Sequence, residues 1–542
     1  MNRLIYGDNL TIMQEVIPKE SIDLIYLDPP FNSNRNYNLM YRNLTGQPIP
    51  EQVDAFCDTW TMDEHKEALA KNIPIILHEN GIDAAYMDMW RFWINALRKV
   101  NEPLLAYLIY MTPRLCSMKS LLKKTGSIYL HCDPTASHYI KCMMDGIFGQ
   151  DNFRNEIVWK RRTGSSSAVH KPNRFGSVTD TILYYTMSDK HIFNPQYSFS
   201  DPRYKKYIEE KFVYKDDNGR LYRNDNLTNP IYSQTLIYEY KGFKPPEKGW
   251  AISKEKMEKW DKEGRLSFPT KPDGRIQRRR YLDELKGKPI QSLWDDIAPV
   301  NSQAKDRLGY PTQKPIDLLK RIILTSTNEG DTVFDPFCGC GTTIYAAQAT
   351  KRNWIGCDIA ILAVNLVSKT LQERYKLADG HSFKIEGIPN SMESAQHLAD
   401  HDKYQFQNWI VERIGGFPTL KKAGDKGVDG RLYFETKNGL KEMVLSVKAG
   451  KIQPTDIRDL RGVLEREANA EMAGFLCMQE PTKAMIQEGA SAGLYEYAGN
   501  QYPRLQILTA RQILEDKQLF KTPTRIGTKV DLKQYLLPMK SD

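Results

Sequence analysis

Two short motifs contain the side chains of this sequence that could do chemistry. The first, Asp28-Pro29-Pro30-Phe31, ends an apolar run near the start of the chain. Its carboxylate and the backbone carbonyl of Pro29 could accept both hydrogens of an exocyclic amine on a nucleobase. The prolines stiffen the loop because their φ is fixed and they have no N–H group. The ring of Phe31 offers an apolar face on which an extruded base could stack.

Such an arrangement would solve a specific chemical problem. The amine lone pair of adenine or cytosine is delocalised into the ring, so two acceptors must localise it towards an electrophile. A methyl group on a sulfonium is already activated, and positioning together with electrostatics would suffice without a metal. The alternative is structural: a Pro-Pro loop in which Asp28 is only a cap.

The second motif, Asp335-Pro336-Phe337-Cys338-Gly339-Cys340-Gly341-Thr342, follows another apolar run far downstream. We expect a turn between a strand and a helix, where glycines let the backbone approach a ligand and the helix start offers free N–H groups. Asp358 ends the next predicted strand, where it could bind the two hydroxyls of a ribose. GxGxxG is absent, so a tight turn without a ligand remains the alternative. Cys338 and Cys340 are expected to pack, because no second Cys/His pair accompanies them.

The segments around these motifs alternate between strands and helices. Strands are predicted at residues 22–28, 126–131, 153–159, 178–186, 331–335 and 354–358, and helices at 104–122, 316–325 and after Gly341. This rhythm predicts an α/β fold with a doubly wound, Rossmann-like parallel sheet built from residues 1–159 and 306–376. Between 160 and 305 the periodicity weakens, which indicates a large insertion. A polar linker is expected at 377–403, followed by a smaller α/β domain at 404–542.

Bulk composition bounds the class of protein. A chain of 542 residues is too long for one compact core, and its net charge of +9 is compatible with a polyanionic partner. Eight scattered cysteines without a CxxC pair fit a reducing compartment. No run approaches the roughly 20 apolar residues that cross a bilayer, and no signal segment opens the sequence. We therefore expect a soluble, cytoplasmic protein with no membrane partner.

The two motifs together resemble the N6-adenine/N4-cytosine DNA methyltransferase family in its permuted, beta-class arrangement, where the catalytic loop precedes the cofactor turn. The resemblance covers roughly residues 1–375 and includes Tyr6-Gly7-Asp8-Asn9-Leu10 and Tyr310-Pro311-Thr312-Gln313-Lys314-Pro315. It implies S-adenosylmethionine as the methyl donor and double-stranded DNA as the substrate. This chain has Cys338 and Cys340 where the family's turn usually has Ala and Ser.

The resemblance also implies roles for individual residues. Asp28 and the Pro29 carbonyl would polarise a flipped base, Pro30 would stiffen the loop, and Phe31 would stack on the base. Cofactor binding would fall to Asp8 at the adenine, to Asp358 at the ribose, and to Thr312, Gln313, Lys314, Asp335, Phe337, Gly339, Gly341 and Thr342. The Asp-Pro-Pro-Phe form favours adenine N6 as the target, with cytosine N4 as the alternative.

The insertion at 160–305 would be the target-recognition region. Its basic side chains could neutralise phosphates or read guanine edges, and its aromatic side chains could stack on bases. The alternative is a solvated face, because the region also holds many acidic residues. The basic residues are Arg161, Arg162, Lys171, Arg174, Lys205, Lys206, Arg220, Arg223, Arg278, Arg279 and Arg280.

Residues 404–500 resemble a different group, the Mrr-type PD-(D/E)xK restriction endonucleases. The resemblance implies that Asp429 binds Mg²⁺ and that Lys448 orients or deprotonates the attacking water. Ser446 stands where that group has Glu or Gln, and Glu412 or Glu435 could supply a carboxylate instead. The alternatives are an inactive DNA-binding fold and an unrelated domain.

The leading hypothesis is a site-specific DNA adenine methyltransferase of a restriction–modification or phage-defence system. A bifunctional protein that also cleaves unmodified DNA is the second hypothesis. In the third, the C-terminal region docks other restriction or defence subunits. The target sequence and a homodimeric state stay open.

Overall fold

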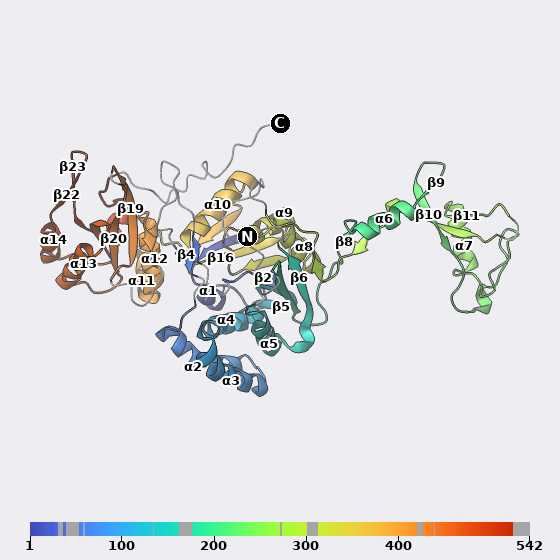
Figure 1. Cartoon of the computed structure of the whole chain (residues 1–542), viewed down its shortest axis with the longest axis horizontal. Helices are drawn as coiled ribbons and strands as arrows, with labels where there is room; N and C mark the ends of the chain where they lie inside the picture. Colours follow the sequence, from blue (N-terminus) through green and yellow to red (C-terminus); the bar gives the residue numbers. More distant parts are fainter. Residues whose placement is uncertain are drawn as a thin grey trace. The chain divides into compact units, whose positions relative to one another are not determined.

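The computed structural model describes residues 1–30, 36–38, 54–57, 60–133, 135–161, 176–271, 274–300, 313–419, 427–437 and 439–523. The chain divides into two compact units, which Figure 1 shows in ribbon form. Unit 1 comprises Met1–Asn194 and Ser292–Asp542, and unit 2 comprises Pro195–Gln291. Phe31, Thr312, Arg162, Lys171 and Arg174 lie outside the described residues.

A nine-stranded sheet forms the centre of unit 1, with the strand order β14-β6-β7-β5-β2-β15-β16-β1-β17. Six neighbouring strands, from β5 to β17, run parallel to one another. The strands are β1 (Asn2–Tyr6), β2 (Ile22–Leu27), β5 (Leu122–Cys132), β6 (Phe153–Lys160), β7 (Thr179–Thr186), β14 (Leu293–Trp294), β15 (Thr332–Asp335), β16 (Asn353–Asp358) and β17 (Phe383–Glu386). The α/β fold and the predicted strands are confirmed.

The sheet is not wholly parallel. β7 pairs antiparallel with both β5 and β6, and the short strand β14 pairs parallel with β6. The expectation of a purely parallel sheet is therefore wrong at this edge. β6 and β7 follow each other without a crossover helix among the described residues, and parallel neighbours need such a crossover.

Helices cover both faces of the sheet (Figure 1). α1 (Asn9–Glu15), α4 (Glu102–Leu121) and α5 (Ser137–Phe148) lie on one face, and α2 (Glu64–Glu79) and α3 (Ala84–Val100) pack against α4. α8 (Ile316–Ser326), α9 (Thr342–Ala349) and α10 (Ile361–Tyr375) lie on the other face. A short pair, β3 (Asn36–Asn38) and β4 (Asp54–Cys57), is antiparallel.

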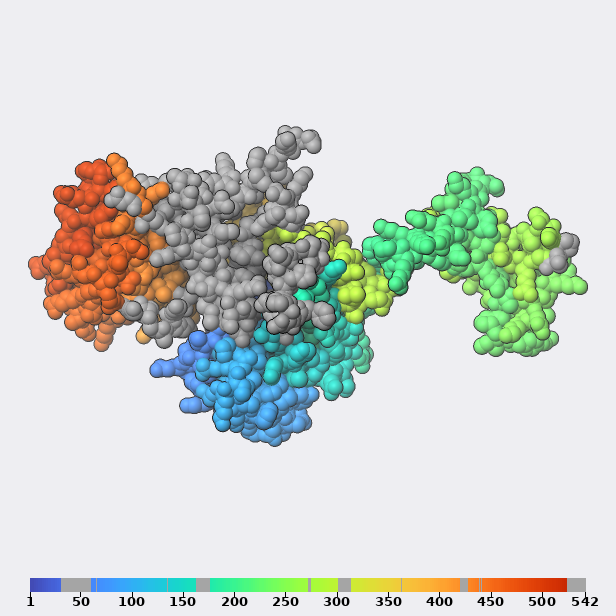
Figure 2. All heavy atoms as spheres, in the orientation of Figure 1, coloured from blue at the N-terminus to red at the C-terminus, as the bar shows by residue number. Residues whose placement is uncertain are grey.

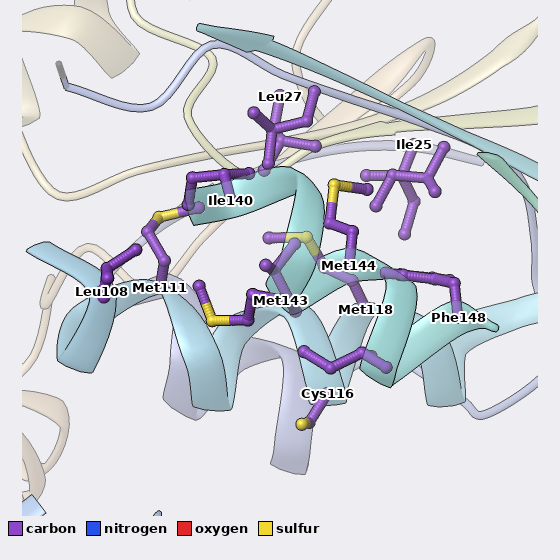
Figure 3. Packing of buried hydrophobic residues seen from close by; sticks show 14 of the residues in the cluster. Ile25, Leu27, Leu108, Met111, Cys116, Met118, Ile140, Met143, Met144 and Phe148 are labelled. Carbon is purple, nitrogen blue, oxygen red and sulfur yellow. The ribbon is translucent and has the colours of Figure 1, made fainter. Parts of the chain in front are cut away.

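Alternation along β2 directs its side chains to the two faces. Ile25 and Leu27 point at the methionine-rich surfaces of α4 and α5, which include Met111 and Met144 respectively (Figure 3). Tyr26 points to the opposite face, because successive side chains of a strand alternate. A strand buried on both faces holds its last residue rigidly, so the loop that begins at Asp28 starts from a fixed point.

The C-terminal part of unit 1 is a five-stranded sheet with the order β18-β19-β20-β21-β24. The orange and red residues of Figure 2 form one closely packed body. β20, β21 and β24 are parallel, and β18 and β19 are antiparallel additions. The strands are β18 (Phe417–Pro418), β19 (Gly430–Thr436), β20 (Gly439–Lys448), β21 (Ala470–Cys477), β22 (Leu494–Tyr497), β23 (Asn500–Pro503) and β24 (Leu505–Thr509). The helices are α11 (Met392–His401), α12 (Lys403–Arg413), α13 (Pro454–Arg466), α14 (Lys483–Ala490) and α15 (Ala510–Leu514).

The expected linker at 377–403 is only partly a linker. β17 extends the large sheet by pairing with β1, and Phe383 is completely buried. α11 follows, with a Ser391 side chain that caps its first turn. A four-residue strand and a mostly polar helix carry too little apolar periodicity to stand out in the sequence.

Unit 2 is smaller than the predicted region 160–305, since β6, β7 and β14 belong to the large sheet. It contains a four-stranded sheet with the order β11-β12-β10-β9 and a core around Trp250, Met257 and Ile276. Its elements are β8 (Tyr197–Ser198), α6 (Pro202–Lys211), β9 (Tyr214–Lys215), β10 (Leu221–Asn226), α7 (Lys254–Lys262), β11 (Leu266–Ser267), β12 (Gln277–Tyr281) and β13 (Lys288–Pro289).

Across the described ranges, no helix combines the length and the apolar character that crossing a membrane requires.

Candidate active site at the carboxyl edge of the sheet

The two motifs lie side by side. β2 and β15 are neighbouring parallel strands, with Leu24 paired to Val333 and Ile25 paired to Phe334. Asp28 follows the last residue of β2, and Asp335 is the last residue of β15. Because parallel strands end at the same edge of a sheet, segments far apart in the sequence meet here.

The Asp28 carboxylate has two different oxygens. Oδ2 forms an ion pair and a hydrogen bond with Nζ of Lys314. Oδ1 is buried and has no hydrogen-bond partner within the described ranges. A buried acceptor without a partner is costly and is typical of a site that is completed by a ligand. Pro29 is buried beside it.

The glycine motif forms a tight turn between β15 and α9. Asp335 Oδ1 accepts a hydrogen bond from the Phe337 N–H at 3.0 Å, and burial raises the pKa of Asp335 to about 7. Gly341 has a φ of +84°, and a Cβ there would lie 2.7 Å from Val367. Glycine is therefore required at this position by conformation and by space. Thr342 is buried at the start of α9.

Asp358, at the end of β16, supports this turn directly. Its Oδ2 accepts the Gly339 N–H at 2.8 Å, and its Oδ1 accepts the Ala360 N–H at 2.9 Å. Burial raises the pKa of Asp358 to about 6, although these backbone donors oppose the rise. The ribose-binding role predicted for Asp358 does not include this contact with the turn.

Asp8, at the end of β1, is held by an arginine that the sequence analysis missed. Arg114 of α4 contacts Asp8 Oδ2 at 2.9 Å and donates to Asn9 Oδ1 at 2.7 Å. Asn9 in turn donates to the Pro336 carbonyl at 2.9 Å. One buried network thus connects the ends of β1 and β15. An arginine among the apolar residues in the middle of this helix was the available signal.

A second buried network lies on β2 and its neighbours. Tyr26 Oη is 3.0 Å from His131 Nδ1, and His131 Nε2 is 3.2 Å from Asp180 Oδ2. Arg161 Nε lies 2.9 Å from Asp180 Oδ1, as an ion pair without hydrogen-bond geometry. Burial alone would raise the pKa of Asp180, but His131 and Arg161 together lower it. This network fixes β2, the strand that ends directly before Asp28.

The C-terminal candidates separate into two groups. Asp429 Oδ2 accepts hydrogen bonds from the Val447 N–H at 2.7 Å and from Ser446 Oγ at 3.3 Å. Lys448 Nζ lies 3.5 Å from Asp456. Asp429, Ser446 and Lys448 therefore belong to one region. Among the described residues, no group of three His, Cys, Asp or Glu side chains could hold a metal ion.

Glu412 lies elsewhere, with its carboxylate accepting a hydrogen bond from the Ile361 N–H at 3.2 Å. This contact directs the carboxylate to the start of α10 and argues against Glu412 as a ligand of a cation at Asp429. Burial raises the pKa of Glu412 to about 8, and the nearby Asp358 adds to the rise.

Comparison with known proteins places the chain in a family. The family model described as DNA methylase matches residues 22–369, more than half of the sequence. The chain therefore belongs to the N6/N4 DNA methylase family.

Individual relatives carry related names. The type II methyltransferase M.EcaI of Enterobacter cloacae is 31% identical over 270 residues, covering 49% of this chain and 57% of the relative. The StyLTI Mod subunit, a type III restriction-modification protein of Salmonella typhimurium, is 26% identical and covers 68% of this chain and 54% of the relative. The DNA adenine methyltransferase YhdJ of Escherichia coli is 26% identical, covering 66% of this chain and 78% of the relative. The chain thus spans little more than half the length of the first two relatives.

Solved structures of low similarity were also found. The cytosine-N4-specific PvuII DNA methyltransferase matches with a TM-score of 0.33 and 12% identity, covering 70% of this chain and 88% of that one. M1.HpyAVI in complex with SAM matches with a TM-score of 0.29 and 15% identity, covering 68% of this chain and 100% of that one. These low scores carry no argument about the fold, which is assigned from the strand order of the large sheet.

Proposed function

We propose that this protein transfers a methyl group from S-adenosylmethionine to the exocyclic N6 amine of adenine in DNA. The observation that carries the proposal is the Asp28 carboxylate beside the glycine turn, whose buried Oδ1 has no hydrogen-bond partner among the described residues. Membership of the DNA methylase family supports the same reaction.

The residues at this edge fit a nucleoside sulfonium. Asp8, Asp335 and Asp358 lie at the ends of β1, β15 and β16, which are neighbours in the sheet. Beside them, Gly339 and Gly341 carry no side chains, so the backbone of the turn can lie close to a ligand. Asp358 would accept ribose hydroxyls, Asp8 would face the adenine ring, and Gln313 would lie near the methionine part. When bound, the cofactor supplies an activated methyl group.

In the proposed mechanism, Asp28 and Pro29 act on the target base. Oδ1 of Asp28 accepts one amine hydrogen and the Pro29 carbonyl accepts the other, which concentrates the lone pair on the nitrogen. The site needs a base that has left the helix stack, since the amine cannot reach a buried carboxylate otherwise. Asp28 then accepts the proton that the methylated amine must lose.

The test replaces Asp28 by Asn, which keeps the shape but removes the charge. Methyl transfer to DNA should fall by at least about 100-fold, as for other groups that stabilise a developing charge. S-adenosylmethionine affinity, measured by calorimetry, should change little. Normal methylation by this variant would refute the assignment.

The target base has one specific alternative, which is cytosine methylated at N4. Adenine is favoured by the Asp-Pro-Pro-Phe motif and by the relative named as an adenine methyltransferase. Mass spectrometry of nucleosides from modified DNA would distinguish N6-methyladenine from N4-methylcytosine. Long-read sequencing of the same DNA would give the recognition sequence.

Unit 2 is proposed to recognise the DNA. It holds 22 Lys and Arg residues against 15 Asp and Glu residues, a net charge of +7 where the whole chain has +9. Such a concentration of positive charge favours a phosphate backbone. A loop with hydrogen bonds to Gly249 and Lys248 presents Ile231 and Tyr232, which are 75% and 59% exposed. Exposed apolar side chains on a basic unit are suited to contact with bases.

The arginine run Arg278–Arg280 is engaged within unit 2. The Arg278 guanidinium packs over Trp260, that of Arg279 over Tyr222, and Arg280 pairs with Asp225. Burial lowers the pKa of Arg278. These arginines therefore stabilise the small sheet, and the exposed basic residues around it are better placed for phosphates.

For the C-terminal region we propose a role in DNA tethering or subunit docking within a restriction–modification system. Type III Mod subunits among the relatives support such a context. A Mg²⁺-dependent nuclease centred on Asp429 and Lys448 is the second candidate, supported by the proximity of Asp429 to the end of β20. Ser446 offers a hard cation only a neutral oxygen.

One experiment separates these two candidates. Unmethylated DNA carrying the recognition sequence is incubated with the protein and Mg²⁺ in the absence of the methyl donor. Cleavage that disappears in Lys448→Ala would establish the nuclease. Intact DNA, together with weaker DNA binding after deletion of residues 403–542, would support tethering.

A further inference from the structure

Lys314 contacts the catalytic loop. The family resemblance places it in the segment that receives the methionine part of the cofactor, yet its ammonium pairs with Asp28. The Lys314 side chain is 13% exposed and that of Asp28 is 17% exposed. An ammonium group this far from water needs a charged partner, and here the partner is the proposed catalytic carboxylate.

We infer that Lys314 is a positioning residue for Asp28, an inference that rests on the function proposed above. A carboxylate can rotate about its Cβ–Cγ bond and exchange its two oxygens. An ammonium bound to Oδ2 fixes that rotation, so Oδ1 alone points at the place of the amine. Oδ1 has no partner among the described residues, which agrees with a carboxylate whose Oδ2 binds Lys314 and whose Oδ1 is available to the amine.

The position of Lys314 between the two motifs supports the inference. Burial raises the pKa of Cys340 in the glycine turn, and the charge of Lys314 opposes this rise. The same charge helps to lower the pKa of Asp180 in the buried network. Lys314 directly precedes Pro315, which occupies the N-cap position of α8, and α8 packs against β2 and β5. The ammonium is therefore attached to the same rigid layer that holds Asp28.

A second Lys–Asp pair, which joins β2 to β5, provides a control. Lys123 Nζ contacts both oxygens of Asp23 in β2, at 2.9 and 2.7 Å. Oδ2 of Asp23 also accepts the Thr332 N–H at 2.9 Å. Both oxygens of this carboxylate are thus occupied, and the pair lies near the beginning of β2 rather than at its end. It represents a structural ion pair next to the same strand, with a Lys123 side chain that is 40% exposed.

The experiment compares Lys314→Met, Lys314→Arg and Lys123→Met in the full chain. Single-turnover methyl transfer is measured with saturating DNA and S-adenosylmethionine, and the affinity for each is measured separately by calorimetry and fluorescence anisotropy. Lys314→Met should reduce the single-turnover rate by about 100-fold, the scale of a misplaced reacting group. Both dissociation constants should stay within about threefold.

Lys314→Arg should recover most of the rate because it keeps a cation beside Oδ2, and Lys123→Met should transfer methyl groups at the normal rate. A role in holding the methionine part predicts the opposite pattern, with weaker cofactor binding and an unchanged rate at saturation. That pattern, or an equal loss of rate in Lys123→Met, would overturn the inference. The Asp28→Asn variant tests the proposed function separately, since it would stay active only if Asp28 were not catalytic.

Discussion

Glu412 accepts a hydrogen bond from the backbone N–H of Ile361, which joins the C-terminal region to the first turn of α10. Glu412 belongs to α12, and this helix makes a second contact of the same kind: Gln405 Oε1 accepts a hydrogen bond from the Asp8 N–H at 3.1 Å. α12 therefore contacts the segments that follow β1 and β16, where we propose that the cofactor binds. Gln407 of this helix donates to the Asp429 carbonyl at 3.2 Å. One helix thus touches both candidate sites of unit 1.

The Gln405 contact predicts that the C-terminal region affects cofactor binding. Gln405→Ala should weaken S-adenosylmethionine binding by about fivefold, since a net hydrogen bond contributes about 1 kcal/mol. Calorimetry on the full chain measures this change. Gln407→Ala is the matched control on the same helix and should leave the affinity unaltered. Equal affinities in all three proteins would contradict the prediction.

The Glu412 carboxyl predicts a pH-dependent stability. Its pKa is about 8 in the folded chain and 4.5 in its ordinary state, so the folded protein holds the proton more tightly. The protonated Glu412 carboxyl contributes to the free energy of unfolding. This contribution is fully present below pH 4.5 and is lost as the pH rises to about 8, because Glu412 ionises at a lower pH in the unfolded chain than in the folded chain.

Glu412→Gln removes this titration while keeping an oxygen for Ile361. The free energy of unfolding of the natural protein, minus that of the variant, should fall as pH rises between these two values and then level off. Denaturant titrations at several pH values measure the difference. A difference that does not vary with pH would show that Glu412 is not held in its protonated form.

The glycine turn predicts different costs for two glycine substitutions. Gly341 and Gly330 have φ values of +84° and +86°, but a Cβ would meet Val367 only at Gly341. Gly330→Ala should cost about 1 kcal/mol of stability from its conformation alone. Gly341→Ala should cost about 1–3 kcal/mol more because the added carbon overpacks the core. Equal losses in denaturant unfolding would show that the turn can relax around the new atom.

The exposed loop of unit 2 predicts a DNA contact by Tyr232. Tyr232→Ala should weaken DNA binding by about tenfold, since stacking on a base contributes about 1–3 kcal/mol. Fluorescence anisotropy with the recognition duplex measures the affinity. Phe92 of α3, which is 68% exposed in unit 1, offers a control, and Phe92→Ala should bind DNA normally. Comparable losses in both variants would remove the argument for this loop.

Most strands and helices of the large sheet are predictable from the sequence, whereas the direction of β7, the bounds of the insertion and the linker at 377–403 are not. Asp28 and the glycine turn were recognisable because prolines, glycines and short apolar runs act on the chain within a few residues of themselves. The weaker signals were missed: β17 has four residues, and the antiparallel direction of β7 leaves no mark on its composition.

Contacts between distant segments could not be read in the same way. Lys314 pairs with Asp28, Arg114 with Asp8, and His131 with Asp180, and each pair joins residues that are far apart in the sequence. A sequence shows which charged groups exist but not which of them share a low-dielectric interior. Strand order decides that, and strand order arises from packing across the whole sheet.

The sequence by itself determined that this chain carries an Asp-Pro-Pro loop, a glycine turn and an α/β alternation, because each depends on local conformational preference and periodicity. Only the tertiary structure decided that β2 and β15 are neighbours and that Glu412 contacts α10 rather than Asp429. It also decided that Oδ2 of Asp28 is bound by Lys314 while Oδ1 has no partner within the described part of the chain. These contacts join groups that are far apart along the chain, and they form only when the strands assemble into the sheet and the helices pack against it.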